Sequence, residues 1–246
     1  MIRRLAVICS ILLLLSACSA SFEDQWVKGE TGRVTRILDG DTLALESGQI
    51  VKLVSVEAPR TGSYDRDPDP HGEKSRRIME SLALGREATL YYPGMTTDRY
   101  DRALAQVTIK TESGETLWLN EELVRKGACW VRIYADTAAG SEPLWISEIA
   151  ARSAKSGLWR EAPPIASIEQ ARAADGKFLI LRGSLGMSEM QEEDCRVSMM
   201  GTELEVDLDA FAGRCPVLPL GEVEIRGWAR GGVIYVGSGS NLRPAH

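Results

Sequence analysis

The stretch Lys52-Leu53-Val54-Ser55-Val56-Glu57-Ala58-Pro59-Arg60 combines an apolar strand pattern with charged residues at its start and end. Asp39-Gly40-Asp41-Thr42 precedes it between two apolar runs, and Asp98-Arg99-Tyr100-Asp101-Arg102 follows it. Carboxylates are the ligands that hard divalent cations prefer, and guanidinium groups match the charged oxygens of phosphates. Three short polar segments on a β framework can therefore supply both metal-binding and phosphate-binding side chains.

In order and spacing, these segments resemble the motifs of the staphylococcal nuclease (thermonuclease) family, which run D-G-D-T, R-L-x-x-V-D-x-P-E and D-x-Y-G-R. The resemblance spans residues 32–161 and includes two helix patterns, over 119–127 and 143–157. It implies a fold between the α+β and all-β classes, in which helices pack on a five-stranded barrel of the OB type. The activity that it implies is calcium-dependent hydrolysis of DNA or RNA.

The resemblance also assigns individual residues. Asp41 falls on the first metal carboxylate of the family, and Glu57 falls on the second, which is an Asp in the family. Arg102 falls on the phosphate-binding arginine that follows D-x-Y-G, with Asp101 in place of the glycine. We therefore expect Asp41 and Glu57 to be the calcium ligands and Arg102 to bind phosphate.

Two departures from the family pattern affect catalysis. Lys52 stands at the other phosphate arginine, where it keeps the charge without the bidentate fork. Arg60 stands at the glutamate base, and a guanidinium accepts no proton, so we expect it to pair with the two carboxylates in place of a cation. Loss of a general base removes a factor of about 10²–10⁴ in rate. We therefore expect weakened calcium binding and weak or absent cleavage.

Other readings of these residues remain open. The whole domain is alternatively a non-catalytic module that binds nucleic acid or an envelope protein on a nuclease-like scaffold. Taken singly, Asp39-Gly40 is also a plain hairpin turn, and the charged residues are also compatible with solvated loop positions.

The N-terminus has the pattern of an export signal. Residues 1–17 hold two arginines and a Leu/Ile-rich run that is too short for a comfortable membrane span. Leu15-Ser16-Ala17-Cys18 resembles the bacterial lipobox, which implies a signal peptide over 1–17, a lipidated Cys18 and a tether over 18–30. Ser19, which is not an Asp, favours the outer membrane, facing the periplasm. The alternative is an ordinary cleaved signal with a coincidental cysteine.

The charge balance limits the classes of partner. The chain has 29 Lys and Arg against 35 Asp and Glu, and loss of residues 1–17 removes two arginines, which leaves 27 basic residues and a net charge of −8. Tight non-specific binding of polyanions normally needs a basic surface, so we expect any single-stranded DNA or RNA to bind in a local cleft. Two histidines in the whole chain argue against histidine-based metal clusters.

The segment Glu161-Ala162-Pro163-Pro164 predicts a boundary, with a first domain over 31–161 and a second over 166–246. Short alternating strands and a few glycine positions make the second domain resemble a small OB-like β domain, with an anonymous β-sandwich as the alternative. Because it is acidic and its few aromatic residues sit at core-like positions, we expect it to have a structural or protein-contact role. Cys195 and Cys215 are the candidate disulfide in an exported protein, and Cys129 is expected to be buried.

Overall fold

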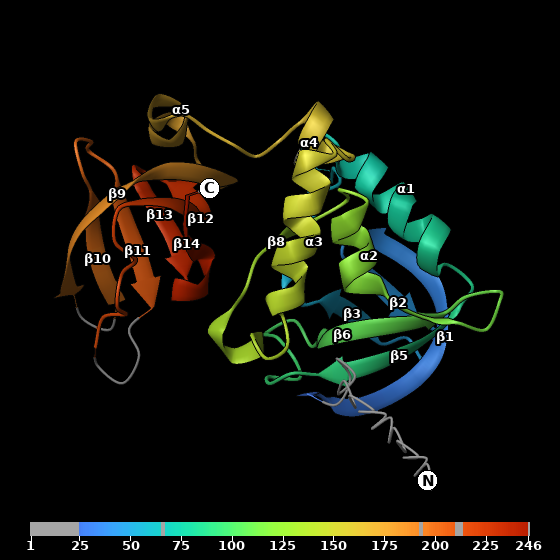
Figure 1. Cartoon of the computed structure of the whole chain (residues 1–246). Coiled ribbons are helices and arrows are strands. Elements are labelled where there is room, and N and C mark those ends of the chain that lie inside the picture. Colours follow the sequence, from blue (N-terminus) through green and yellow to red (C-terminus); the bar gives the residue numbers. More distant parts are fainter. Residues whose placement is uncertain (1–24, 65–66, 192–193, 210–213, 246) are drawn as a thin grey trace, which may run out of the picture.

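The computed structural model describes residues 25–64, 67–191, 194–209 and 214–245. The predicted signal peptide over 1–17, the lipidation site Cys18 and the tether up to residue 24 lie outside these residues. The chain forms two β domains joined by a non-helical segment over 162–167, and Figure 1 draws them side by side. Among the described residues, no helix has the length and apolarity needed to cross a bilayer.

The first domain contains a closed five-stranded barrel, which confirms the predicted fold. Its strands hydrogen-bond in the order β3-β2-β1-β5-β6, and the parallel pairing of β3 with β6 closes the barrel. β7 pairs antiparallel with β6 at the edge of the sheet, and β4 pairs with β8 in a separate two-stranded sheet. The bounds are β1 (Val27–Asp39), β2 (Thr42–Leu45), β3 (Ile50–Leu53), β4 (Val56–Glu57), β5 (Glu87–Tyr92), β6 (Ala103–Lys110), β7 (Thr116–Trp118) and β8 (Trp130–Val131).

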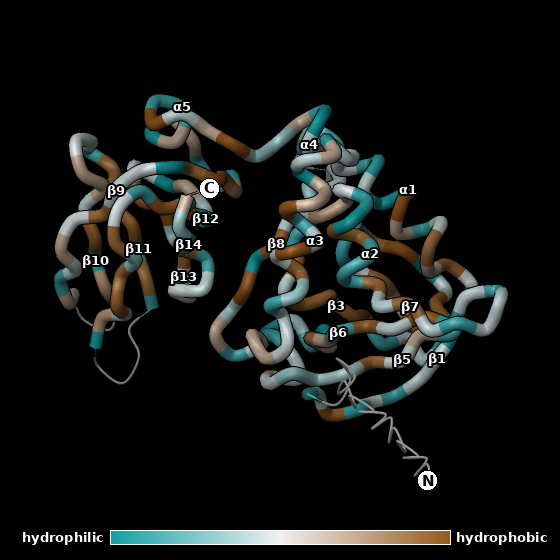
Figure 2. The backbone as a smooth tube through the Cα atoms, in the orientation of Figure 1, coloured by the Kyte–Doolittle hydropathy of each residue, from teal (hydrophilic) through white to brown (hydrophobic). Residues whose placement is uncertain are grey.

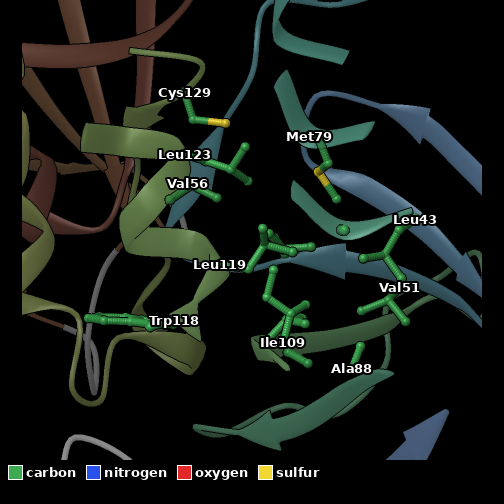
Figure 3. Packing of buried hydrophobic residues seen from close by; sticks show 14 of the residues in the cluster. Leu43, Val51, Val56, Met79, Ala88, Ile109, Trp118, Leu119, Leu123 and Cys129 are labelled. Atoms are coloured by element: carbon green, nitrogen blue, oxygen red, sulfur yellow. The ribbon is translucent and has the colours of Figure 1, made fainter. Parts of the chain in front are cut away.

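Helices close one side of the barrel and complete its core. Figure 3 shows Met79 of α1 and Leu119 of α2 beside Leu43 and Val51 of the barrel strands, and all four side chains are fully buried. Figure 2 shows the same distribution as hydrophobic stretches in α2, β3 and β6. Cys129 belongs to this core, as expected. The helices of the domain are α1 (Gly72–Ala83), α2 (Leu119–Arg125), η2 (Ala135–Thr137), α3 (Glu142–Ser153) and α4 (Leu158–Glu161).

A left-handed residue separates β3 from β4 within the apolar stretch that begins at Lys52. Ser55 has φ 63°, and its hydroxyl accepts a hydrogen bond from Gln106 Nε2 at 3.2 Å. This turn directs β4 away from the barrel toward β8, where Glu57 is paired with Trp130. The position of Glu57 therefore depends on β8, which is distant in the sequence.

The first domain also begins earlier than the sequence indicated. β1 starts at Val27, inside the stretch 18–30 that we expected to be a tether. Trp26 is buried, and its indole nitrogen donates a hydrogen bond to the carbonyl of Ala139 at 2.7 Å. This anchoring makes residues 26–30 part of the folded domain.

The second domain repeats the strand connectivity of the first barrel. Its strands hydrogen-bond in the order β13-β11-β10-β9-β12, β12 pairs with β13 to close the sheet, and β11 runs parallel to β13. The disulfide between Cys195 and Cys215 is formed, as predicted. The elements are α5 (Ile168–Ala173), β9 (Lys177–Gln191), β10 (Asp194–Met199), β11 (Glu205–Asp209), β12 (Glu222–Arg230), β13 (Val233–Gly237), η3 (Gly239–Asn241) and β14 (Leu242–Pro244).

A buried ionic network joins the two domains. Arg226 of β12 donates hydrogen bonds to both carboxylate oxygens of Glu148 in α3 and to the carbonyl of Val131 in β8, the last at 2.9 Å. It also pairs with Glu224, which in turn accepts two hydrogen bonds from Arg152 of α3. Buried charges require this degree of pairing, so the network fixes one orientation of the second domain on the first.

Contacts at β8 extend the interface toward the polar rim of the barrel. Asn241 pairs with the backbone of Ile133, donating to its carbonyl at 2.7 Å and accepting from its N–H at 2.9 Å. Trp130 stacks on Phe178 of β9 with ring centroids 4.8 Å apart. Since β8 carries the partner of Glu57, the second domain supports the strand pair that positions this carboxylate.

Candidate functional site

The predicted site residues gather where the β1–β2 turn, the β3–β4 segment and the loop before β6 meet. Lys52, Glu57 and Arg102 line a cleft of about 510 Å³. Asp41 lies beside this cleft in contact with Lys52. Arg60 lies outside it and lines a neighbouring, larger cleft. The structure therefore brings four of the five predicted residues together and separates the fifth.

Asp41 is a buried carboxylate whose two oxygens are both engaged. Oδ1 accepts a hydrogen bond from Thr42 Oγ1 at 2.9 Å, and Oδ2 accepts one from the backbone N–H of Ala58 at 2.8 Å. Oδ2 also lies 2.6 Å from Lys52 Nζ. The turn between β1 and β2 thus holds this carboxylate against the start of the segment that carries Arg60.

Lys52 lies between the two predicted metal ligands. The register of β2 and β3 pairs Thr42 with Lys52, which places the lysine beside Asp41. Its Nζ is 2.6 Å from Asp41 Oδ2 and 3.6 Å from Glu57 Oε1. Burial alone lowers the pKa of Lys52, but the charges of Asp41 and Glu57 outweigh it and hold the pKa above its ordinary value. The Lys52 ammonium therefore occupies the position between the two carboxylates as a cation supplied by the chain itself.

This geometry corrects the prediction for Arg60, because it is Lys52 that pairs with the carboxylates. The Arg60 guanidinium carbon lies 3.9 Å from the ring centroid of Trp228 in the second domain. Over the described parts of the chain, no carboxylate is within 4.0 Å of this guanidinium. The backbone fixes the direction, since Arg60 N–H donates to Asp69 Oδ2 at 3.1 Å and its carbonyl accepts from Asp69 N–H at 3.0 Å.

Arg132 is a site residue that the sequence reading missed. Its Nη1 lies 3.5 Å from Glu57 Oε2, and its guanidinium carbon lies 4.2 Å from the Tyr134 ring centroid. Burial lowers the pKa of Arg132, and the charge of Glu57 opposes that shift only in part. In the sequence, Arg132 is marked only by its position directly after the apolar pair Trp130-Val131. Its partner Glu57 is identified only by the pairing of β4 with β8.

Arg102 is held by Asp98 at the opposite side of the cleft. Nε and Nη2 of Arg102 lie 2.8 Å and 2.6 Å from Asp98 Oδ2, while Oδ1 accepts the backbone N–H groups of Tyr100 and Arg102. Burial raises the pKa of Asp98, but the hydrogen bonds from Arg102 and the backbone outweigh it and lower the pKa overall. Asp101 has φ 58°, a conformation that glycine adopts without strain.

Asp39 adds a further carboxylate that the sequence reading treated only as a turn residue. Its Oδ1 accepts hydrogen bonds from the N–H groups of Gly40 at 2.8 Å and Thr61 at 3.2 Å. Burial, followed by repulsion from Asp41, raises the pKa of Asp39 to about 6. The hydrogen bond from Thr61 ties the β1–β2 turn to the residue that follows Arg60.

The arrangement does not fit a calcium ion. Calcium takes about 6–8 oxygen ligands, including free carboxylate oxygens. Here Asp41 and Glu57 have the right donor chemistry, but Lys52 lies within salt-bridge distance of both and Arg132 contacts Glu57. Within the residues that the structure describes, no group of three or more Asp, Glu, His or Cys side chains is placed to hold a metal. What the site offers is a cleft of about 510 Å³ whose cations include Lys52 and Arg102.

Comparisons with known proteins agree with this architecture. The profile described as staphylococcal nuclease homologue matches residues 50–161. An uncharacterized endonuclease of Escherichia coli O157:H7 is 35% identical over 137 residues, which cover 54% of this chain and 80% of that protein. A thermonuclease of Staphylococcus hyicus is 24% identical over 133 residues, covering 53% and 76%, and a micrococcal nuclease of Shigella flexneri is 28% identical over 137 residues, covering 53% and 74%. The barrel, the order of its motifs and these matches together show that this chain belongs to the staphylococcal nuclease homologue family.

Proposed function

We propose that this protein binds single-stranded DNA or RNA in the cleft between Lys52 and Arg102, and that hydrolysis there is weak or lost. The observation that carries the proposal is the Lys52 ammonium, which lies 2.6 Å from Asp41 and 3.6 Å from Glu57. A cation that is part of the chain already neutralises the carboxylates that a metal ion would need. Calcium binding is weakened accordingly.

The absence of a base supports weak hydrolysis. At the position of the family's glutamate, the Arg60 side chain is directed to Trp228, so it neither accepts a proton from water nor approaches the carboxylates. Asp41 Oδ2 pairs with Lys52 and Glu57 Oε2 pairs with Arg132, so both carboxylates are already engaged in ion pairs. Without a positioned base, a rate about 10²–10⁴ below that of an intact site is expected.

Binding is supported by the groups that remain accessible. The Arg102 side chain is 30% exposed at the cleft while Asp98 holds its orientation, and a preorganised guanidinium is well suited to phosphate. Three of the relatives are named as an endonuclease, a thermonuclease and a micrococcal nuclease. The shared barrel therefore favours a nucleic-acid strand as the ligand of this cleft.

We also propose that the protein is exported and held at the outer membrane through a lipid on Cys18, facing the periplasm. The motif Leu15-Ser16-Ala17-Cys18 supports this location, and the Cys195–Cys215 disulfide suits an oxidising compartment. Incorporation of labelled fatty acid into the chain, and its loss in Cys18→Ala, would be the expected result. A Cys18→Ala chain that still carries the label would contradict the assignment.

The decisive experiment measures binding and cleavage on the same full-length protein. Fluorescence anisotropy with a labelled trinucleotide tests binding, and gel analysis of denatured DNA and of RNA, with calcium or with a chelator, tests cleavage. We expect binding that does not depend on calcium, with little or no product. Arg102→Ala should weaken binding, whereas Arg125→Ala, an exposed arginine paired with Glu122 on α2, serves as the matched control. Rapid calcium-dependent cleavage, or no binding of any strand, would contradict the proposal.

A further inference from the structure

The cleft that contains Arg60 lies between the two domains and is the larger of the two clefts. It has a volume of about 1070 Å³, against about 510 Å³ for the cleft at Lys52 and Arg102. Arg99 and Tyr100 line both, so the two clefts meet at the loop before β6. The second domain contributes Lys177 of β9, Trp228 and Arg230 of β12, and Tyr235 of β13 to its wall.

Three cations in this cleft have no carboxylate partner in the described parts of the chain. They are Arg60, Arg99 and Lys177, none of which lies within 4.0 Å of a described carboxylate. Arg99 instead donates a hydrogen bond to the hydroxyl of Tyr100 at 2.8 Å.

Two acidic residues of the same cleft already have partners within its wall. Asp69 accepts the backbone N–H of Arg60, and Asp175 lies 3.8 Å from Arg230. Asp67 is the third carboxylate of the wall. Uncommitted positive charge on both domains therefore faces one space.

Aromatic rings stand beside these cations. Tyr100 and Tyr235, which line the cleft, are 63% and 40% exposed. The Arg60 guanidinium carbon lies over the Trp228 ring, 3.9 Å from its centroid. Nucleobases stack on aromatic rings and on guanidinium planes, while phosphates pair with the cations between them.

The cleft is preformed, because the domains are docked rather than loosely tethered. The Arg226–Glu148 pair and the two hydrogen bonds between Asn241 and Ile133 hold the second domain in place. Trp228 and Tyr235 therefore stay opposite Arg60 and Arg99 without any closing motion. A site that needs no rearrangement loses less free energy to ordering when a ligand binds.

We propose that the interdomain cleft binds the continuation of the single strand whose phosphates occupy the first cleft, with bases stacked on Tyr100, Tyr235 and the Arg60–Trp228 pair. This inference rests on the proposed function, since it requires a strand in the first cleft. A duplex is unsuitable because its bases are already stacked on one another and cannot reach these rings. Arg60 thereby has a binding role in place of the family's catalytic one.

Strand length provides the test on the full-length chain. A labelled trinucleotide covers the first cleft alone, whereas a dT15 strand reaches both. We expect dT15 to bind at least tenfold more tightly, and Tyr235→Ala to weaken dT15 about tenfold while leaving the trinucleotide unchanged. Lys177→Ala should make the salt dependence of dT15 binding shallower by about 0.7 in the log–log slope.

Arg172→Ala serves as the matched control, because Arg172 is exposed on α5 of the same domain, where it pairs with Glu203 away from the cleft. Equal affinities for both strand lengths, or a Tyr235→Ala chain that binds dT15 normally, would overturn the inference and leave the proposed function intact. Failure of the wild type to bind either strand would overturn both. Displacement of dT15 by poly-glutamate at equal charge concentration would identify an acidic protein segment as the ligand and would also overturn the inference.

Discussion

Replacing Lys52 by alanine should convert the carboxylate pair into a calcium site. The lysine side chain is 18% exposed, and its ammonium lies 2.6 Å from Asp41 and 3.6 Å from Glu57. Breaking a buried ion pair by removing one partner costs about 3–5 kcal/mol, and the partial exposure of Lys52 places the expected loss near the lower value. For a chain of this size, that corresponds to a fall in Tm of roughly 6–12 °C.

Calcium should restore part of this loss in the variant, where Arg132 still contacts Glu57, and leave the wild type unchanged. A ligand that binds only the folded state at about 100 times its Kd adds about 2.7 kcal/mol to the free energy of unfolding. The assay is urea unfolding followed by tryptophan fluorescence, in 1 mM calcium chloride and in chelator, with magnesium as a second cation. Lys126→Ala is the matched control, since Lys126 pairs with Glu122 at 3.4 Å and its own side chain is 41% exposed. Its expected change is below about 1 kcal/mol.

Two results would refute this reasoning. If Lys52→Ala is as stable as the wild type in chelator, the ammonium does not neutralise a repulsive carboxylate pair. If the variant loses stability and calcium returns none of it, Asp41 and Glu57 do not face one cation position. A double variant that combines Lys52→Ala with Arg60→Glu adds back the missing acidic residue. Calcium-dependent cleavage by this double variant would show that the site residues keep the family geometry.

Three further predictions concern the interface and the second domain. Arg226→Met should lower the free energy of unfolding by about 3–5 kcal/mol, because Glu148 and Glu224 lose the buried charge of Arg226. Urea unfolding measures this loss, and an unchanged midpoint would contradict the prediction. Burial raises the pKa of Glu224, but the Arg152 and Arg226 contacts outweigh it and lower the pKa overall. Its stabilisation is therefore complete above the ordinary value of 4.5 and is lost as the pH falls below it, so Tm measured from pH 7 to 3 should decline more steeply in the wild type than in Glu224→Gln. Removing both Cys195 and Cys215 opens a loop with a sequence separation of 20 and should cost roughly 3 kcal/mol, and the variant's stability, unlike that of the wild type, should not respond to a reducing agent.

The barrel was predictable because its signals are local. The apolar runs on either side of Asp39-Gly40 form β1 and β2, and the helix patterns over 119–127 and 143–157 match α2 and α3 within a few residues. The short strands β4, β8 and β14 were not resolved as elements of their own, since segments of two or three residues carry no measurable periodicity. Their pairing partners lie far away in the sequence, and only the folded chain brings them together.

The site was predictable as a list of residues but not as a set of contacts. Matching Lys52 and Arg60 to family positions identified both departures, yet it assigned the carboxylates to the wrong cation. The β2–β3 register places Lys52 against Asp41, and the fold of the loop up to Asp69 directs Arg60 toward Trp228. Neither interaction can be predicted from the residues adjacent to Lys52 or Arg60 in the sequence.

By itself, the sequence determined the family, the barrel with its helices, the disulfide and the identity of the substituted site residues, because each depends on short-range pattern or on residue chemistry. Only the tertiary structure decided which charges meet. Ion pairs such as Lys52 with Asp41, Arg132 with Glu57 and Arg226 with Glu148 form across elements that are 11, 75 and 78 residues apart. Coulomb interactions act through space over a few ångströms, and the spacing of residues along a chain does not fix those distances.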